Sequence, residues 1–322
     1  MCGIVGYVGD RDCADVLVDA LSKLEYRGYD SAGIAVVEKG VIKVEKCKGR
    51  LANLVDKMAV DGKPQGHCGI GHTRWATHGE PSDINSHPHG NKRVSIVHNG
   101  IIENYKQIKD FLIEEGYSFV SETDTETVAK LLDYYYVDDP VDTIIKVLSE
   151  IKGSYALGIM FRDYPDTVFA VRKECPLIVG VGENENFLAS DVPAIIKYTR
   201  DYYLLEANEI AVVKKDSVQI YDMHKEPVHK EINTADWDVD AAEKGGYEHF
   251  MLKEIHEQPA AVRDTVSPRI INGMPDLSQD GVDMQKLKDY RQIFIVACGT
   301  AMHAGMVGKY VIEKLARKPV IV

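Results

Sequence analysis

The run CGIVGYV at residues 2–8 decides the expected fold. Its side chains are apolar on both alternating faces of an extended strand, which is typical of a strand in a sheet that is covered on both sides. Comparable β-like runs recur at 33–38, 67–73, 93–98, 154–161, 167–172 and 209–214. Apolar residues spaced as on one face of a helix predict helices over 13–25, 103–115, 125–136 and 141–152. Residues 2–220 are therefore expected to form one layered α+β domain, with helices covering the faces of its sheets.

The composition changes after residue 220. From 221 to 290 the chain is richer in Asp, Glu, Lys, Gly and Pro, which predicts a linker region with some helix. Residues 291–322 then have the pattern of one βαβ unit, with a buried strand at 293–297, a glycine turn, a helix, and a second strand from 319. Two parallel strands and one helix cannot bury their own faces. We therefore expect the chain to stop inside a second, doubly wound domain.

Bulk composition narrows the class of protein. The chain has 45% hydrophobic and 27% charged residues and no apolar run near the roughly 20 residues of a membrane helix, which predicts a soluble globular protein. The amino end lacks the basic leader of a signal peptide, and six scattered cysteines without a C-x-x-C pair indicate free thiols, so a cytoplasmic location is expected. A net charge of −12 would repel phosphate backbones, which argues against nucleic acid as a partner.

Cys2 is the first candidate for chemistry. It directly follows the initiator methionine, and removal of Met1 would leave a thiol and a free α-amine on one residue. That amine has an unperturbed pKa of about 7.7–8.0, so part of it is an unprotonated base near neutral pH, beside the nucleophile that it must activate. A small apolar side chain at the start of a strand is the alternative, and the position of Cys2 alone does not decide between them.

Several longer motifs carry a resemblance to a known family. They are CGIVG at 2–6, LEYRGYDSAGIA at 24–35, GHTRWATHG at 71–79, NSHPH at 85–89 and HNGIIENY at 98–105. Together they resemble the class II glutamine amidotransferases, which are N-terminal-nucleophile hydrolases, and within them the branch that passes ammonia to fructose 6-phosphate. HFMLKEI at 249–255 and ACGT at 297–300 resemble the linker and the first sugar-isomerase (SIS) domain of that branch. The resemblance implies a four-layer αββα sandwich in residues 2–220, with residues 291–322 beginning the SIS domain.

The resemblance implies that Cys2 is the nucleophile and that Asn99 and Gly100 stabilise the oxyanion. An amide side chain and a glycine N–H at the end of the strand 93–98 can point at one developing negative charge, and such a donor is typically worth about 3 kcal/mol. Asn-Gly is also the commonest β-hairpin turn, and the dipeptide alone favours that interpretation.

Two charged residues match the two ends of a glutamine molecule. Arg74, at the end of an apolar strand, has a planar fork that suits the α-carboxylate, although a surface salt bridge would explain it equally well. Asp124 matches the family residue that receives the α-ammonium group. The run TDTE at 123–126 also has the pattern of a helix N-terminus, where Asp is a good cap, and the two roles are compatible.

The same loops supply further candidates. The resemblance implies that Thr77 and His78 complete the pocket wall, that Trp75 gates an ammonia channel, and that His87 shapes the loop over glutamine. A lone Trp beside a strand is more often a core residue. No regular spacing with a carboxylate or a cysteine accompanies His72, His78, His87 and His89, so a metal site is not expected. The amidase mechanism that the resemblance implies needs no cofactor.

At the far end, Gly299, Thr300 and Ala301 precede a predicted helix. Backbone N–H groups and the positive end of the helix dipole can hold a sugar phosphate there, although a plain glycine turn is an equal alternative. Ala301 stands where family members often have a phosphate-binding Ser. The rest of the isomerase half is absent, so we do not expect this chain alone to form glucosamine 6-phosphate.

The predicted activity is hydrolysis of glutamine to glutamate and ammonia. In the intact enzyme, which is expected to be a homodimer, the ammonia would go to fructose 6-phosphate. One alternative is a catalytically silent module that senses glutamine or a sugar phosphate through the same pockets. Another is a different class II amidotransferase, against which the YRGYD run at 26–30 and the SIS-like end argue.

Overall fold

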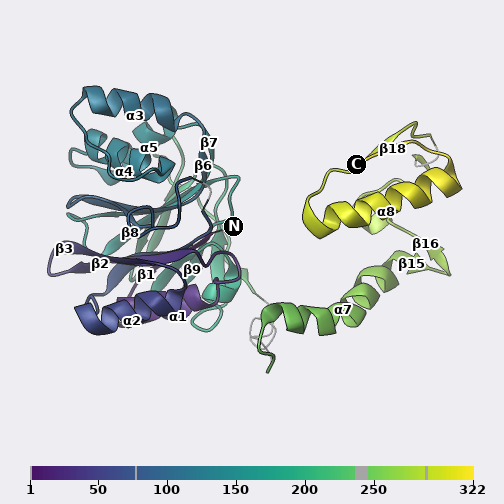
Figure 1. Cartoon of the computed structure of the whole chain (residues 1–322), viewed down its shortest axis with the longest axis horizontal. Coiled ribbons are helices and arrows are strands. Elements are labelled where there is room, and N and C mark those ends of the chain that lie inside the picture. The colour runs from purple at the N-terminus through teal and green to yellow at the C-terminus, as the bar shows by residue number, and fades with distance from the viewer. Residues whose placement is uncertain (1, 77, 236–245, 287–288) are drawn as a thin grey trace. The chain divides into compact units, whose positions relative to one another are not determined.

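The computed structural model describes residues 2–76, 78–235, 246–286 and 289–322 (Figure 1). The chain divides into two compact units, Met1–Gly246 and Tyr247–Val322. The first unit extends beyond the limit at residue 220 that the sequence predicts, because β14 (Asn233–Thr234) pairs with β11 (Asp201–Leu204). The segment up to β14 therefore belongs to the first fold rather than to a linker.

One sheet of the first unit has eight strands, in the order β14-β11-β9-β10-β1-β4-β2-β3. Every neighbouring pair in it is antiparallel. The amino-terminal strand lies inside the sheet, between β10 and β4, and all of its residues are buried, as expected for a strand covered on both faces. The remaining strands are β1 (Gly3–Val8), β2 (Ser31–Glu38), β3 (Val41–Lys48), β4 (Cys68–Arg74), β9 (Ile178–Val181) and β10 (Asn186–Ala189).

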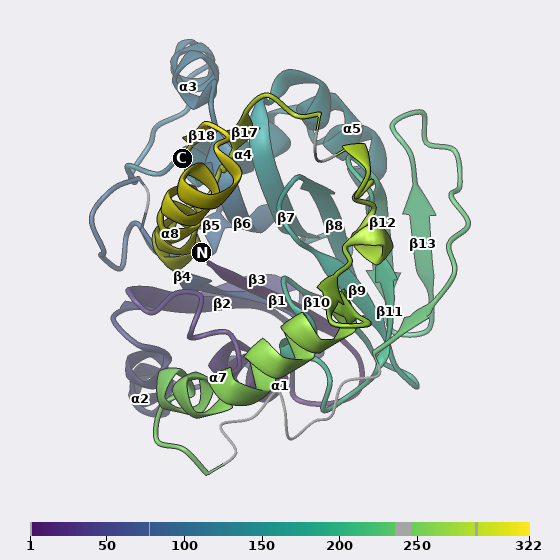
Figure 2. The same ribbon diagram turned by 90° about the vertical axis from the view of Figure 1, so that its right-hand side faces the viewer.

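A second, six-stranded sheet has the order β13-β12-β8-β7-β6-β5 and is also antiparallel throughout. Its longest pairing is β6 with β7, in register from Val94 opposite Phe161 to Ile102 opposite Gly153. Figure 2 shows β7 and β8 beside each other, with β12 and β13 further along the sheet. The strands are β5 (His89–Gly90), β6 (Val94–Ile102), β7 (Gly153–Phe161), β8 (Thr167–Lys173), β12 (Ile210–Lys214) and β13 (Val218–Tyr221).

Helices cover the outer face of each sheet. In Figure 1, α1 and α2 lie along the eight-stranded sheet, whereas α3, α4 and α5 lie on the other side of the unit, over the six-stranded sheet. Local capping explains several helix starts: Asp12 accepts a hydrogen bond from the N–H of Ala14, and Asp139 caps a helix that has Pro140 in its first turn. The helices are α1 (Cys13–Ser22), α2 (Leu51–Asp61), α3 (Tyr105–Glu114), α4 (Asp124–Tyr135), α5 (Pro140–Glu150) and the short 3₁₀ turn η1 (Val192–Ala194).

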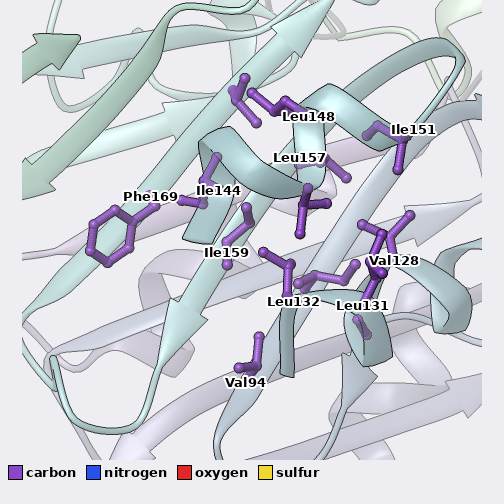
Figure 3. Packing of buried hydrophobic residues seen from close by; sticks show 14 of the residues in the cluster. Val94, Val128, Leu131, Leu132, Ile144, Leu148, Ile151, Leu157, Ile159 and Phe169 are labelled. Atoms are coloured by element: carbon purple, nitrogen blue, oxygen red, sulfur yellow. The ribbon is translucent and has the colours of Figure 1, made fainter. Parts of the chain in front are cut away.

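Three apolar cores hold these four layers together. Between the two sheets, side chains from both interdigitate, among them Ile4, Ile70, Val97, Val168 and Leu188. A second core joins the eight-stranded sheet to α1 and α2. The third joins the six-stranded sheet to α4 and α5, and Figure 3 shows how side chains of those helices meet residues of β7 and β8. Burying one such side chain contributes about 1.5–3 kcal/mol. The α+β prediction for this part of the chain is confirmed.

The elements that the sequence missed are short or half-exposed. β3 lies at the edge of its sheet with exposed and buried residues mixed, and α2 buries only Leu51, Leu54 and Met58. One predicted boundary matters for the site. The strand expected at 93–98 continues to Ile102, so Asn99 and Gly100 lie within β6 and form neither its end nor a hairpin turn.

The second unit contains the predicted βαβ pattern. β17 (Ile293–Phe294) pairs in parallel with β18 (Val320–Ile321), and α8 (Gly299–Ala316) connects them; β17 is shorter than the strand expected at 293–297. Before it come α7 (Phe250–Val266), η2 (Ser267–Arg269), β15 (Ile270–Ile271), β16 (Met274–Pro275) and η3 (Ser278–Asp280). Among the described residues, every helix falls short of the length or the hydropathy that a bilayer-spanning segment requires. All six cysteines are unpaired, as predicted.

Candidate active site

Most of the predicted site residues surround one pocket of about 290 Å³ in the first unit. The sheets bring them together, because Gly3 pairs with Thr73 and so sets Cys2 beside the end of β4. The predicted residues that line the pocket are Cys2, Arg74, Trp75, His78, His87, Asn99, Gly100 and Asp124. Thr77 lies outside the described residues. The other lining residues were not predicted: Arg27, His98, Ile101, Thr123, Thr125, Ser154, Cys175 and Pro176.

The sulfur of Cys2 accepts a hydrogen bond from the backbone N–H of Trp75 at 3.1 Å. The thiol can in turn donate to the Trp75 carbonyl, 3.5 Å away. Burial raises the pKa of the Cys2 thiol above its usual value, although the Trp75 hydrogen bond opposes this shift. The thiol therefore stays protonated near neutral pH in this environment, and a nearby base is needed to make it nucleophilic.

Two side chains hold the backbone carbonyl of Cys2. Asn99 donates to it from Nδ2 at 3.0 Å, and Arg27 donates from Nε at 3.1 Å. Arg27 is itself fixed by an ion pair of 2.9 Å with Asp191. The Asn99 amide thus presents its NH₂ group within a hydrogen-bond length of the nucleophilic residue.

The backbone conformation at position 100 and the close approach of a neighbouring strand both require a glycine. Its φ is +124°, which side chains disfavour, and a Cβ on it would lie 2.1 Å from the carbonyl oxygen of Ser154 on β7. This conformation sits inside the β6–β7 pairing, where Gly100 lies opposite Tyr155. The Asn-Gly pair therefore marks a distortion of a buried strand at the pocket wall, which a turn propensity could not predict.

Arg74 is buried, with 3% of its surface exposed, so it is not a surface residue in a solvated salt bridge. Its Nη2 donates to the backbone carbonyls of His78 and Gly79. Its Nη1 is buried without a hydrogen-bond partner among the described residues. A buried guanidinium with a spare N–H in a pocket is suited to bind an anion such as a carboxylate.

Asp124 does not cap its helix. The cap of α4 is Thr123, whose side chain accepts a hydrogen bond from Glu126 N–H, and Asp124 is the first helical residue. Its carboxylate instead accepts a hydrogen bond of 2.8 Å from the N–H of Ile102, at the end of β6. The side chain is buried and lines the pocket, so it offers a negative group to a ligand there.

The loop after β4 is held by the YRGYD run. Asp30 accepts a hydrogen bond from the N–H of Ala76, and a Cβ on Gly28 would lie 2.7 Å from the Arg74 backbone. Trp75 contacts the ring of Tyr29 edge-on at 5.6 Å and is 49% exposed, so it is not a core residue. This close packing gives a physical reason for the glycine and the aspartate of that run.

Four buried histidines lie in or next to the pocket wall, and two of them, His87 and His98, line the pocket itself. His72 stacks on His87 at 4.1 Å between ring centroids, and His87 meets His89 edge-on at 5.0 Å. Burial lowers the pKa of His72 to about 3, and it lowers the pKa values of His87, His89 and His98 as well. These rings are therefore neutral at physiological pH. In the described part of the chain, no three His, Cys, Asp or Glu side chains are grouped to hold a metal.

Sequence reasoning missed Arg27, which lay inside a quoted motif without an assigned role. It also missed His98, whose Nδ1 lies 2.9 Å from Thr125 Oγ1, because periodicity does not show which polar residue of a buried strand faces a cavity.

Gly299, Thr300 and Ala301 lie in the second unit at the start of α8, where Gly299 has a positive φ of 60°. Their binding role stays a prediction.

Residues 72–197 match the family model described as glutamine amidotransferase domain. Over 324 aligned residues the chain is 58% identical to a glutamine–fructose-6-phosphate aminotransferase [isomerizing] of Caldanaerobacter subterraneus subsp. tengcongensis. The alignment covers 99% of this chain and 53% of that protein. The chain is 49% identical over 322 residues to the Aquifex aeolicus protein of the same name, with coverage of 99% and 53%. The chain thus spans about half the length of these curated relatives.

Among solved structures, the glutamine phosphoribosylpyrophosphate amidotransferase of B. subtilis matches the fold with a TM-score of 0.61. The match covers 69% of this chain and 49% of that chain at 24% identity, so it bears on the fold alone. It agrees with the α+β architecture of the first unit.

Proposed function

Because the chain is a homologue of the glutamine–fructose-6-phosphate aminotransferases over about half of their length, we propose that it hydrolyses glutamine through a thioester on Cys2. The observation that carries the proposal is the convergence of four groups on one pocket: a thiol, a buried carboxylate, an amide donor, and a buried guanidinium N–H that has no hydrogen-bond partner among the residues that the structure describes. These groups match the side-chain amide and both charged ends of glutamine.

Binding follows from the charges of the pocket. Nη1 of Arg74 would bind the α-carboxylate, and Asp124 would receive the α-ammonium group. Thr77 and His78 would complete the wall, with His87 behind the loop. Since both charged contacts are buried, they are strong and orient the amide carbon toward the Cys2 sulfur.

The reaction proceeds in two steps. With Met1 removed, the α-amine of Cys2 takes the thiol proton, directly or through a water, and the thiolate attacks the amide carbon. Asn99 Nδ2 and the Gly100 N–H stabilise the tetrahedral oxyanion, and the nitrogen leaves as ammonia after receiving the proton from the amine. Water then attacks the thioester, releases glutamate and returns the thiol.

The ammonia has a further destination in the whole protein. The βαβ unit of β17, α8 and β18 would begin the first SIS domain, and Trp75, which lines the pocket, would gate the ammonia path. A longer, homodimeric protein would use the ammonia to convert fructose 6-phosphate to glucosamine 6-phosphate, with Gly299, Thr300 and Ala301 near the sugar phosphate.

Glutamate release from glutamine by the purified chain tests the proposal. Replacing the nucleophile in Cys2→Ala should abolish glutamate production, whereas Cys175→Ala, which changes the other pocket-lining cysteine, should retain it. Equal activity in both variants would contradict the assignment of Cys2. Glutamine binding without any glutamate from the processed chain would instead favour a silent sensing module.

A further inference from the structure

The imidazole of His72 contacts the proposed oxyanion-stabilising residue. His72 lies on β4 with no exposed surface. Its Nε2 is 3.0 Å from the backbone carbonyl of His98 and 3.0 Å from Oδ1 of Asn99. Both neighbours are oxygen acceptors, so Nε2 carries the proton and donates to them.

This donor determines which way the Asn99 amide faces. With Oδ1 turned to the N–H of His72, Nδ2 points to the other side and donates to the Cys2 carbonyl at 3.0 Å. In the flipped amide, Nδ2 would meet the N–H of His72, and Oδ1 would face the Cys2 carbonyl. Both contacts are repulsive, and the position where the oxyanion forms would then meet an acceptor instead of a donor.

We propose that His72 is a positioning residue that holds the Asn99 amide with its NH₂ group facing the reacting carbon. The inference rests on the proposed glutamine hydrolysis. It gives a buried side chain of β4 the role of orienting the Asn99 amide. His72 is not among the residues that line the pocket, and it acts only through Asn99.

The surroundings of His72 keep this donor in place. Its ring is stacked on His87 with an angle of 19° between the planes, and His87 is fixed because its Nδ1 accepts the N–H of His98 at 3.3 Å. Burial lowers the pKa of His72 to about 3, so the ring stays neutral and keeps one N–H across the working pH range. Its Nδ1 is buried without a hydrogen-bond partner in the described part of the chain, so the ring's hydrogen bonds to His98 and Asn99 are both made through Nε2.

A matched pair of variants tests the inference. His72→Gln keeps an N–H donor near the Nε2 position, whereas His72→Met has nearly the same shape and no donor. Removing an oxyanion donor outright costs about 10²–10³-fold in kcat, so a misoriented one should cost less but still at least about tenfold. We expect His72→Met to lower kcat by that amount with glutamine KM little changed, and His72→Gln to stay within about threefold of wild type.

A double-mutant cycle separates positioning from loss of stability. In an Asn99→Ala background, His72→Met should lower kcat no further, because the amide that it orients is already absent. A purely structural role would reduce activity to the same extent in both backgrounds. Circular dichroism and thermal unfolding establish that each variant is folded. If His72→Met does not fold, His72→Asn replaces it, since the shorter amide cannot reach Asn99.

The outcomes separate the two proposals. Wild-type chain that makes no glutamate would overturn the proposed hydrolysis, and this inference with it. Active wild type in which the donor-containing and donor-free variants have equal kcat would overturn the role of His72 alone. So would a full additional loss in the Asn99→Ala background.

Discussion

Lowering the pH from 7.5 to 5.5 should destabilise the folded chain by about 4 kcal/mol through three buried histidines. Burial lowers the pKa of His72 to about 3 and holds the pKa values of His87 and His89 well below the ordinary range. In the unfolded chain each has a pKa near 6.5. The unfolded state therefore binds more protons at pH 5.5, and stability falls as the pH drops through 6.5.

The magnitude follows from the unfolded pKa alone, since the folded rings remain neutral at pH 5.5. At pH 5.5, protonation of one histidine stabilises the unfolded state by about 1.4 kcal/mol. At pH 7.5 the same term is less than about 0.1 kcal/mol. Three such residues give about 4 kcal/mol, a large part of the roughly 5–15 kcal/mol that stabilises a typical domain. The loss should continue below pH 5.5, whereas above pH 7.5 the three histidines together should change the stability by less than about 0.2 kcal/mol.

Denaturant unfolding at a series of pH values measures this directly. The slope should correspond to uptake of about two protons on unfolding at pH 6.2 and of nearly three at pH 5.2, and His89→Gln should reduce it by up to about one proton. His229→Gln is the matched control, because this side chain is exposed. A wild-type stability that is flat from pH 7.5 to 5.5, or an equal slope in His89→Gln and wild type, would refute the assignment of buried neutral rings.

Two further predictions concern the pocket wall. Gly100→Ala should destabilise the chain by more than about 2 kcal/mol and abolish activity, because its Cβ would lie 2.1 Å from the Ser154 carbonyl at a φ of +124°. Gly40→Ala, with a φ of +76° but no atom within 4 Å, should cost only about 1 kcal/mol in the same unfolding assay, and equal costs would contradict the steric argument. Arg74→Lys should raise glutamine KM at least about tenfold in the glutamate assay, since a point charge replaces the buried fork. Arg93→Lys, outside the pocket, should leave KM unchanged, and equal KM values for both variants would argue against Arg74 as the carboxylate site.

Long apolar strands and joined motifs made much of this architecture predictable. The β1 run is buried on both faces as its pattern requires, and its antiparallel pairing with β4 brings Cys2 and Arg74 to one edge. Position-specific motifs then named the polar residues that converge on the pocket. Elements with a weak hydrophobic pattern were missed, because the edge strand β3 and the helix α2 are each partly exposed to solvent.

What the sequence could not provide is the direction in which each buried polar group faces. Asn-Gly at 99–100 has the local signal of a turn, but pairing with β7 overrides it and continues the strand to Ile102. The TDTE run correctly indicates a helix start, yet Thr123 rather than Asp124 makes the cap. The contact of His72 with Asn99 joins two strands of different sheets, and no local pattern encodes such a contact.

The most direct test of the central claim is covalent trapping of the nucleophile. The purified chain would be incubated with a glutamine analogue that carries an electrophilic group in place of the amide, and the amino-terminal peptide would be weighed by mass spectrometry. The account predicts loss of Met1 and one adduct on Cys2, formed more slowly when glutamine competes. An adduct on Cys175 instead, or a processed Cys2 that stays unmodified while the analogue occupies the pocket, would contradict it.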